Sequence, residues 1–194
     1  TMALDLSAFE QALGSANVVR EKETLREHEM ATFATSAHIP AILRPANTSE
    51  VQECLRIASR LNYRVHPISR GHNWGYGSSV PFADNCLLLD LSRMNRILEY
   101  DNDLGFVVLE PGVTQQQLYD FLQAQGGRFW MDATGSSPEC SVLGNTMERG
   151  FGHTPLSDHF ANSCCYEVVL PSGERIETGL GSFPNARGKH VYRY

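Results

Sequence analysis

The sequence predicts a mixed fold of helices and strands arranged as two lobes. An apolar run, a helical run and a second apolar run follow one another within residues 41–68, which is the pattern of a βαβ unit with parallel strands. Near residue 133 the composition changes, because Gly, Ser and polar residues replace the periodic apolar ones. We interpret this change as the boundary between a first lobe with the βαβ unit and a second lobe with a hairpin.

The composition is that of an ordinary globular chain. Its 194 residues suffice for one large domain or two small lobes, and 42% of them are hydrophobic and 20% charged. The net charge of −6 comes without a basic block, which argues against a nucleic-acid partner. No apolar run approaches the ~18 residues of a membrane span, and the N-terminus has no signal pattern, so we expect no membrane partner.

The number and spacing of the cysteines indicate the cellular compartment and the capacity for metal binding. The five cysteines stand at positions 54, 86, 140, 164 and 165. They form no CxxC metal pattern and their number is odd, so we expect reduced thiols in a cytoplasmic protein. We expect no metal site.

Residues 1–39 are predicted to form a helical segment ahead of the main domain. Apolar positions at helical spacing predict a helix over residues 4–13, and Gly14 is expected to end it. Residues 20–30 are rich in charge and are expected to form a solvated surface segment.

The βαβ unit follows. Residues 41–44 predict a strand that stops at Pro45. A helix is expected to begin at residues 47–50, where acceptor side chains precede a Glu. Its apolar positions fall at helical spacing: Val51, Leu55, Ala58 and Leu61. Residues 63–68 predict the second strand.

Two further strands are predicted at residues 86–89 and 105–109. The turn-rich residues 101–103 lie between them, which suggests that the two strands form a hairpin. Thr114 is expected to cap the next helix, and Gly126 to close it.

A second hairpin is predicted near the end of the chain. Its strands are expected at residues 166–170 and 175–178, with a turn at the Pro-Ser-Gly sequence of residues 171–173. Beyond Gly179 the sequence is polar and predicts no core element.

Residues 67–79 form the first of two glycine-rich zones, with the sequence PISRGHNWGYGSS. The zone follows a predicted strand and places three glycines within seven residues. Such a chain can turn its backbone N–H groups inward as a concave anion nest, and phosphate is the usual guest. One interpretation is therefore a pyrophosphate cradle for a nucleotide cofactor; the alternative is a plain loop between two strands.

Residues 133–158 form the second glycine-rich zone, in which small residues cluster with Asn, Glu, Arg and His. Neither zone has the spacing of GxGxxG or of the P-loop, so the sequence does not predict a Rossmann or Walker site. Two such zones, one of them after a βαβ unit, suit a long dinucleotide lying between two lobes.

The two zones resemble the flavin-binding loops of the vanillyl-alcohol oxidase / p-cresol methylhydroxylase flavoprotein family. The first carries PISxGxNxGYG from Pro67, and the second carries VLGNTMERGxGxTPxxDH from Val142. The strand pair that begins EVVLPxGE at Glu167 is also similar. The likeness covers residues 40–194 and is closest to the branch that acts on para-substituted phenols.

This resemblance implies an α+β fold, a PCMH-type FAD-binding domain whose two α/β lobes hold FAD between them. It implies cofactor contacts from the first zone: Pro67, Ile68, Ser69, Arg70, Gly71, His72, Asn73, Gly75, Tyr76 and Gly77. It implies contacts from the second zone and the following strand: Pro138, Val142, Gly144, Asn145, Glu148, Arg149, Gly150, Gly152, His153 and Val168.

Individual roles follow from the resemblance. The backbone N–H groups of residues 69–73 are expected to hold the pyrophosphate, and Glu148 to accept from a ribose or ribityl hydroxyl. Arg149 is expected to pair structurally. Asp158 and His159 either reach the flavin ring or hydrogen-bond within their own loop, and the same two roles are open for His153.

His72 departs from the pattern of the phenol branch, which usually has Lys at this position. In the related berberine-bridge and sugar-oxidase branches, a His in this setting bonds covalently to the flavin, and a neutral imidazole is a competent nucleophile. The alternative is a His that only hydrogen-bonds a phosphate or the ring edge. Cys140 lies about two positions from where those branches place a second, cysteine link.

The resemblance also implies a C-terminal substrate domain that this chain lacks, and the catalytic residues are expected there. The expected function is an FAD-dependent oxidoreductase, an oxidase or dehydrogenase of an alcohol or a para-substituted phenol, with this chain as its FAD-binding part. The alternative is a non-catalytic flavin-binding subunit or fragment. Expected partners are a small-molecule substrate, a substrate domain or separate chain, and a second copy in a homo-oligomer.

Overall fold

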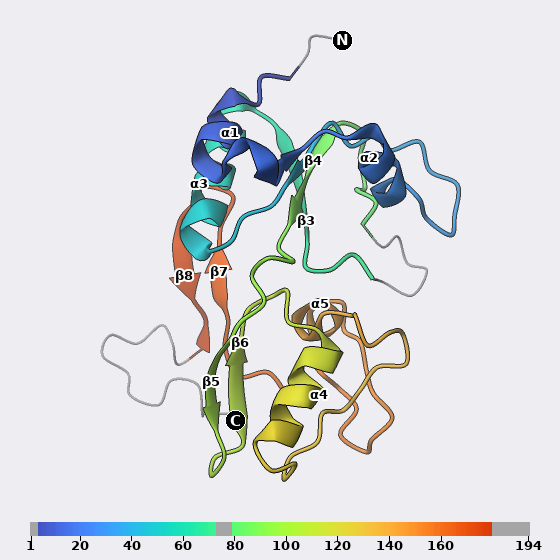
Figure 1. The fold of residues 1–194 in the computed structure, drawn as a ribbon, viewed down its shortest axis with the longest axis vertical. Coiled ribbons are helices and arrows are strands. Elements are labelled where there is room, and N and C mark those ends of the chain that lie inside the picture. Colours follow the sequence, from blue (N-terminus) through green and yellow to red (C-terminus); the bar gives the residue numbers. More distant parts are fainter. Residues whose placement is uncertain (1–3, 73–78, 180–194) are drawn as a thin grey trace. The chain divides into compact units, whose positions relative to one another are not determined.

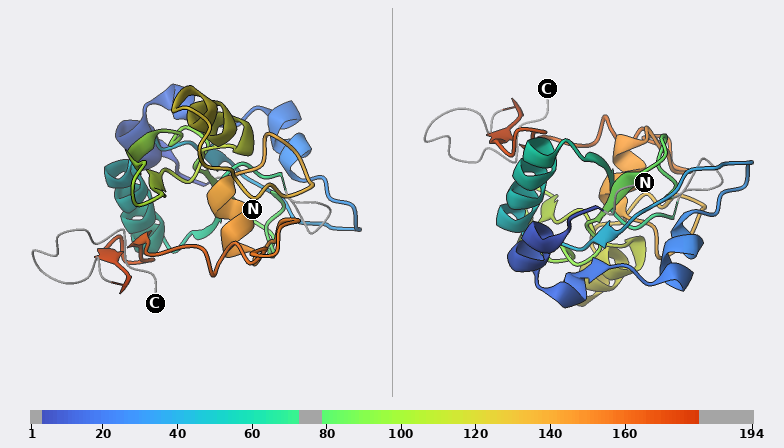
Figure 2. Two further views of the ribbon diagram at one scale, coloured as in Figure 1. Left: turned by 90° about the horizontal axis from the view of Figure 1, so that it is seen from below. Right: turned by 90° about the horizontal axis from the view of Figure 1, so that it is seen from above.

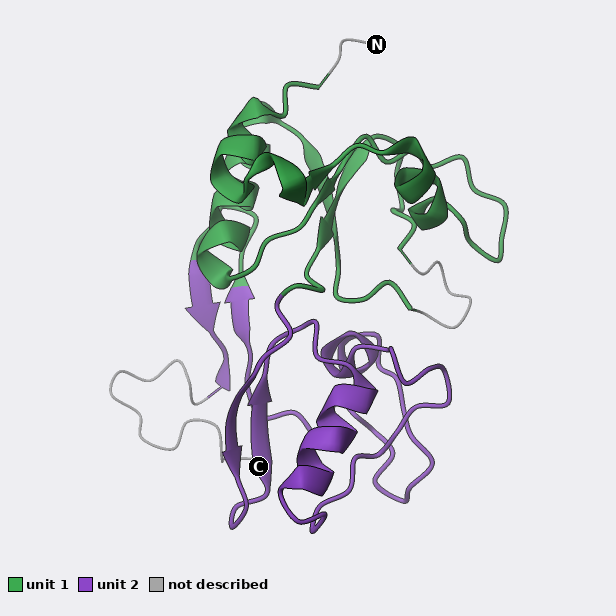
Figure 3. Ribbon diagram, in the orientation of Figure 1, with its two compact units in different colours: residues 1–93, 169–174 green, residues 94–168, 175–194 purple. Residues whose placement is uncertain are grey.

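The computed structural model describes residues 4–72 and 79–179. The chain forms two compact units, coloured separately in Figure 3. Unit 1 comprises residues 1–93 and 169–174, and unit 2 comprises residues 94–168 and 175–194. The division therefore falls well before residue 133, because the change in composition there marks a loop-rich part of unit 2.

Unit 1 is built on a four-stranded sheet in the order β1-β2-β4-β3 (Figure 1). The strands are β1 (Val18–Val19), β2 (Ile42–Leu43), β3 (Arg64–Ile68) and β4 (Cys86–Asp90). Both β2 and β3 run parallel to β4, and β1 is antiparallel to β2. All five residues of β4 are buried, so this strand is the centre of the unit.

The predicted βαβ unit is present with parallel strands, but its two strands are not neighbours. β4 lies between them, with Ile42 and His66 both opposite Leu88. A strand buried on both faces needs a continuous apolar run, and β4 has one in Cys86-Leu-Leu-Leu89. The prediction that this run pairs with residues 105–109 was therefore wrong.

Helix α3 (Thr48–Leu61) connects β2 to β3. The Asn47 side chain accepts a hydrogen bond from the Glu50 backbone N–H, which confirms the predicted N-cap. The buried face differs from the expected one, since Leu55 and Leu61 are only half-buried. The buried positions are Val51, Cys54, Ile57 and Ala58.

The N-terminal helices also belong to unit 1. Helix α1 (Ser7–Leu13) ends at Gly14 as predicted, and it packs on α3 with the Phe9 ring stacked near the Tyr63 ring. A short 3-10 turn, η1 (Ser15–Asn17), leads to β1. The charged segment forms a helix, α2 (Lys22–His28), with no buried residue, which agrees with its predicted exposure.

Unit 2 is built on a hairpin and a helix. The hairpin pairs β5 (Ile97–Asp101) with β6 (Phe106–Leu109), and so the turn predicted at residues 101–103 joins these two strands. Helix α4 (Gln115–Ala124) begins with the predicted Thr114 cap, completed as a capping box by Gln117. The apolar core contains Val113, Leu118 and Leu122, packed against side chains of the hairpin.

A second hairpin, β7 (Glu167–Val169) and β8 (Arg175–Glu177), confirms the last predicted strand pair. Its turn lies beside α3 (Figures 1 and 2), where Gln52 and Arg56 donate to the Gly173 carbonyl oxygen at 2.8 and 3.1 Å. Gly173 has a φ of +80°, and a Cβ there would lie 2.8 Å from the Gln52 carbonyl oxygen. Only Gly fits this turn.

Across residues 4–72 and 79–179, none of the helices has the length and apolar character that crossing a membrane requires.

Candidate functional site

The first glycine-rich zone leaves the sheet at the carboxyl end of β3. Ile68 and Asp90 end β3 and β4 opposite each other, and Arg44 directly follows β2. The Arg44 Nε donates to the Asp90 carboxylate at 3.1 Å. In open sheets with parallel strands, ligands bind beyond these carboxyl ends. The zone therefore starts where the sheet topology favours a ligand, beside an ion pair that the sequence did not single out.

The described part of the first zone is held at both ends. Gly71 has a φ of +69°, and a Cβ there would lie 3.2 Å from the Ser79 Cβ and 3.3 Å from the Ile68 Cδ1. The Ser79 hydroxyl, itself buried, donates to the His28 carbonyl oxygen at 3.2 Å. The two ends of the zone thus meet around a position that favours Gly.

The predicted contacts in the first zone differ in exposure. Ile68 is buried, whereas Pro67 and His72 are exposed. Ser69, Arg70 and Gly71 are half-buried. Four predicted contacts lie outside the described residues: Asn73, Gly75, Tyr76 and Gly77.

The second zone is anchored on the start of α4. Its short helix α5 (Val142–Met147) is capped by Ser141, whose hydroxyl accepts from the Gly144 N–H at 2.8 Å and donates to the Pro111 carbonyl oxygen at 2.6 Å. The carbonyl oxygens of Pro138 and Cys140 accept hydrogen bonds from the first backbone N–H groups of α4. The zone is therefore held in place by polar contacts.

Cys140 is 3% exposed, and its Sγ lies 2.8 Å from the Ser136 Oγ. This thiol is packed inside unit 2.

The turn after α5 positions Arg149. This residue has a φ of +57°, and its guanidinium lies 4.6 Å from the centroid of the Phe160 ring and 3.8 Å from the Asp158 carboxylate. These contacts are structural pairings within the loop. Glu148, beside it, is exposed and therefore accessible to a hydroxyl donor.

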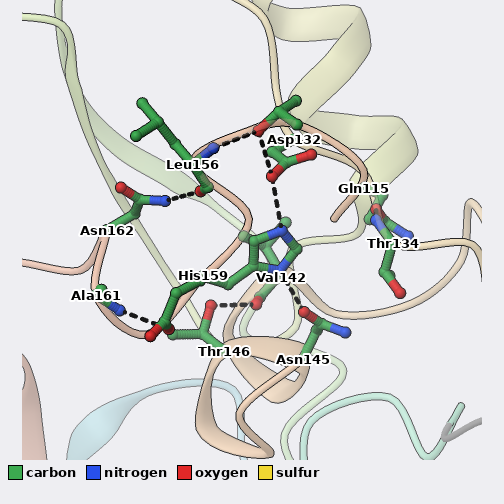
Figure 4. Close-up of polar contacts among 12 residues, drawn as sticks. Gln115, Asp132, Thr134, Val142, Asn145, Thr146, Leu156, His159, Ala161 and Asn162 are labelled. Atoms are coloured by element: carbon green, nitrogen blue, oxygen red, sulfur yellow. Dashed lines mark hydrogen bonds and ion pairs between the residues drawn. The ribbon is translucent and has the colours of Figure 1, made fainter. Parts of the chain in front are cut away.

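A polar cluster joins the second zone to the two residues that flank it, Asp132 and His159 (Figure 4). The His159 Nδ1 lies 2.5 Å from the Asn145 Oδ1, and the His159 Nε2 lies 3.6 Å from the Asp132 carboxylate. The Thr154 hydroxyl donates to the same carboxylate at 2.9 Å. Two glycines make room for the cluster, since a Cβ on Gly150 would overlap Asn145 and one on Gly152 would overlap Asp132.

Three predicted contacts of the second zone therefore meet in one cluster: Asn145, Gly150 and Gly152. His159 lies in the same cluster, where its hydrogen bond is the loop contact that was one of its two expected roles. The others are spread around it: Pro138, Glu148, Arg149 and His153 are exposed, and Val142, Gly144 and Val168 are half-buried.

Asp132 was missed in the sequence. Its signal was the position of a carboxylate directly after the apolar run Phe129-Trp-Met131, at the edge of the glycine-rich zone.

The described residues fit a polar dinucleotide cofactor. At Gly150 and Gly152 a Cβ would overlap the polar side chains of Asn145 and Asp132, and at Gly71 the positive φ favours Gly. The His159 Nε2 is a buried nitrogen without a hydrogen-bond partner among the described residues, which is the kind of polar atom that functional sites contain.

Comparison with known proteins defines the class. Residues 39–179 match the model of the FAD binding domain family, and the chain belongs to that family. Comparison of structures narrows this further, since the fold of the chain matches the fold of PCMH-type flavoproteins. A crystal structure of p-cresol methylhydroxylase with substrate bound aligns with a TM-score of 0.92 and 31% identity, covering 97% of this chain and 37% of that one. The chain is thus an FAD-binding domain.

Other relatives extend this picture. A structure of 4-ethylphenol oxidase from Gulosibacter chungangensis aligns with a TM-score of 0.91 and 36% identity over 96% of this chain and 36% of that one. The 4-cresol dehydrogenase [hydroxylating] flavoprotein subunit of Pseudomonas putida is 34% identical over 96% of this chain and 36% of its own length. The 1'-carboxy-chondrochloren decarboxylase of Chondromyces crocatus is 45% identical over 97% of this chain and 35% of its own length. The chain spans about a third of each relative.

Proposed function

We propose that this chain is the FAD-binding part of an FAD-dependent oxidoreductase that acts on an alcohol or a para-substituted phenol. One observation carries the proposal: nearly the whole chain aligns, at 31% and 36% identity, with enzymes named for p-cresol and 4-ethylphenol. A small-molecule substrate and a substrate domain, in the same or a separate chain, belong to this proposal. When bound, FAD supplies the redox chemistry by accepting electrons from the substrate.

The residues of this chain bind and orient the cofactor in this proposal. The backbone N–H groups beside Gly71, whose φ is positive, hold the pyrophosphate in this proposal. Asn145 supplies a side-chain amide in the second zone, and the exposed Glu148 accepts from a hydroxyl. The proposal leaves proton transfer to the substrate domain.

Flavin absorbance tests the binding half of the proposal. The purified chain, incubated with FAD and freed of excess by gel filtration, is expected to retain the absorbance bands of a protein-bound flavin. A folded chain that stays colourless and shows no thermal shift with FAD would contradict it. The substrate half is tested on the protein that contains this chain together with a substrate domain, by following flavin bleaching with 4-alkylphenols under nitrogen.

A second candidate function is the decarboxylation of a carboxylated substrate. The 45% identity to a protein named a decarboxylase supports it. Release of CO2 from a carboxylated phenol, with no bleaching by 4-alkylphenols, would favour this second function. Bleaching by neither substrate class, in a protein that retains FAD, would favour a non-catalytic flavin-binding subunit.

We further propose that a ring nitrogen of His72 is bonded to the 8α carbon of the flavin in place of one 8α hydrogen, with O2 as the oxidant that takes up the two electrons released. Support comes from its exposed position next to the Gly71 turn, where a cofactor held by the loop can reach it. Denaturing and digesting the holoprotein is expected to yield a His72 peptide heavier by the mass of FAD, and His72→Ala should abolish this addition. An unmodified peptide from a fully loaded yellow protein would instead leave His72 a hydrogen-bonding contact.

A further inference from the structure

His159 is the most enclosed histidine of the second glycine-rich zone. Its side chain is 13% exposed, whereas His153, six residues earlier, lies on the surface. The ring lies between Asp132, from the loop before the zone, and Asn145, from α5 (Figure 4), and the Thr154 hydroxyl contacts Asp132. Burying an imidazole costs free energy unless its nitrogens are paired. The contacts of the two His159 nitrogens therefore indicate what the ring does in this cluster.

The contact with Asn145 fixes the direction of a side-chain amide. An amide oxygen only accepts hydrogen bonds, so the His159 Nδ1 carries the hydrogen and donates to the Asn145 Oδ1 at 2.5 Å. The amide nitrogen of Asn145 then takes the opposite direction, and it makes no hydrogen bond with any described residue. Asn145 is half-buried on α5, and its amide lies against the backbone of Gly150, so its N–H groups form a donor of fixed direction.

The Asp132 carboxylate lies on the other side of the His159 ring. The His159 Nε2 faces this carboxylate at 3.6 Å, and the carboxylate is held by the Thr154 hydroxyl. Gly152 leaves the space that the carboxylate occupies, and its N–H donates to the Ser157 carbonyl oxygen. The order of the cluster is therefore Thr154, Asp132, His159, Asn145, with a free donor at one end.

We propose that His159 is a positioning residue that holds Asn145 with its amide N–H groups presented to an oxygen acceptor of the bound FAD. Asp132, oriented by Thr154, holds the His159 ring in place. The proposal rests on the proposed binding of FAD by this zone. His159 does not touch the cofactor in this account; it acts through Asn145.

Two substitutions of His159 separate its two nitrogens. The side-chain nitrogen of Asn stands near the place of the His Nδ1, and that of Gln near the place of the Nε2. His159→Asn therefore keeps a donor to Asn145, whereas His159→Gln places its side-chain nitrogen near the Nε2 position and leaves the Asn145 Oδ1 without this donor. FAD affinity, measured by titration of flavin fluorescence, is expected to stay within about threefold in His159→Asn and to fall about tenfold in His159→Gln.

A double-mutant cycle tests whether the effect passes through Asn145. Asn145→Ala is expected to weaken FAD binding about tenfold by itself, and His159→Gln should then add less than about twofold. His38→Gln serves as the matched control, because that histidine lies in unit 1 and its side chain is 73% exposed. Thermal unfolding of each variant without FAD monitors folding.

The outcomes divide cleanly. Losses of affinity that multiply in the double variant, or equal losses in His159→Asn and His159→Gln, would overturn the positioning role while leaving FAD binding intact. A parent chain that binds no FAD would overturn the proposed function and this proposal together. Should His159→Gln fail to fold, Asp132→Asn replaces it, with an expected loss of about threefold that also disappears in the Asn145→Ala background.

Discussion

The two units of the chain use different means to fix their structure. Unit 1 buries a whole strand, β4, between two parallel neighbours, and its fully buried side chains are apolar, with Phe9 the largest and most of the others aliphatic. In unit 2 the strands β5 and β6 have no fully buried residue, and the glycine-rich zone is held by side-chain hydrogen bonds. Apolar packing thus shapes the first unit, whereas polar contacts shape much of the second.

An ion pair between an exposed arginine and a buried carboxylate illustrates the second kind of contact. In unit 2 the buried Glu110 carboxylate accepts from the Arg96 side chain at 2.7 Å and from the Arg96 backbone N–H at 2.8 Å. The hydrogen bond with Glu110, and next its negative charge, raise the pKa of Arg96 above its ordinary value. The pair links the start of β5 to the end of β6. It therefore holds two strands together, as apolar side chains do in unit 1.

A matched pair of leucine truncations should show the largest difference between the units. Leu88 on β4 is fully buried and Leu118 on α4 is 5% exposed. Leu88→Ala should lower the free energy of unfolding by about 3–5 kcal/mol and Leu118→Ala by about 2–3 kcal/mol, because the tighter core leaves the larger cavity. Chemical denaturation measures the loss, and hydrogen exchange of peptides from each unit shows where it falls.

The result would break the comparison if the order were reversed. A larger loss in Leu118→Ala would mean that the small core of unit 2 carries more of the stability than its polar contacts do. Increased exchange confined to unit 2 in both variants would have the same meaning.

Helix caps offer a second, smaller contrast. Ser141 caps α5 and also donates to the Pro111 carbonyl oxygen, so Ser141→Ala removes two hydrogen bonds at a buried site and should cost about 2 kcal/mol. Asn47, half-buried at the start of α3, accepts from the Glu50 N–H and donates to the Glu50 carboxylate at 3.0 Å, and Asn47→Ala should cost about 1 kcal/mol. The two variants are compared by urea denaturation. Equal costs would show that the deeper burial of Ser141 adds nothing to the stability that its hydrogen bonds provide.

The same contrast explains what the sequence could predict. The caps at Asn47 and Thr114 were predicted correctly because a cap depends on residues three positions apart. The hairpin β7–β8 was predicted for the same reason, since its turn is local. The place of β4 and the existence of β5 were missed, because strand order depends on pairing between distant segments.

The candidate site divides in a similar way. Glycine-rich zones and the motif around Asn145 are visible as sequence patterns, and they led to FAD. The cluster of Asp132, Asn145 and His159 is not visible, because its members stand 13 and 14 positions apart and meet only when the loop folds back. Loop geometry of this kind is set by polar contacts, which leave no periodicity in the sequence.

The pH dependence of stability gives the smallest expected effect, and it concerns unit 1. Burial, and next the negative charges of Glu50 and Glu53, raise the pKa of the Cys54 thiol to about 12. A free thiol in the unfolded chain has a pKa of about 8.5 to 9. Below that pKa the thiol is protonated in both the folded and the unfolded chain, and its contribution to stability is fully present. As the pH rises from about 9 to about 12, only the unfolded chain loses the proton, so stability falls.

At pH 9 the loss attributable to Cys54 should be about 0.5 kcal/mol, growing by at most about 1.4 kcal/mol for each further pH unit. Other groups titrate in this range, so the measurement is a difference between the parent chain and Cys54→Ala. The parent is the more stable at pH 7, because the truncation leaves a cavity in unit 1, and its advantage should shrink between pH 7 and pH 9.5. An advantage that stays constant would show that the thiol ionises equally in both states, and hence that the core of unit 1 admits water at α3.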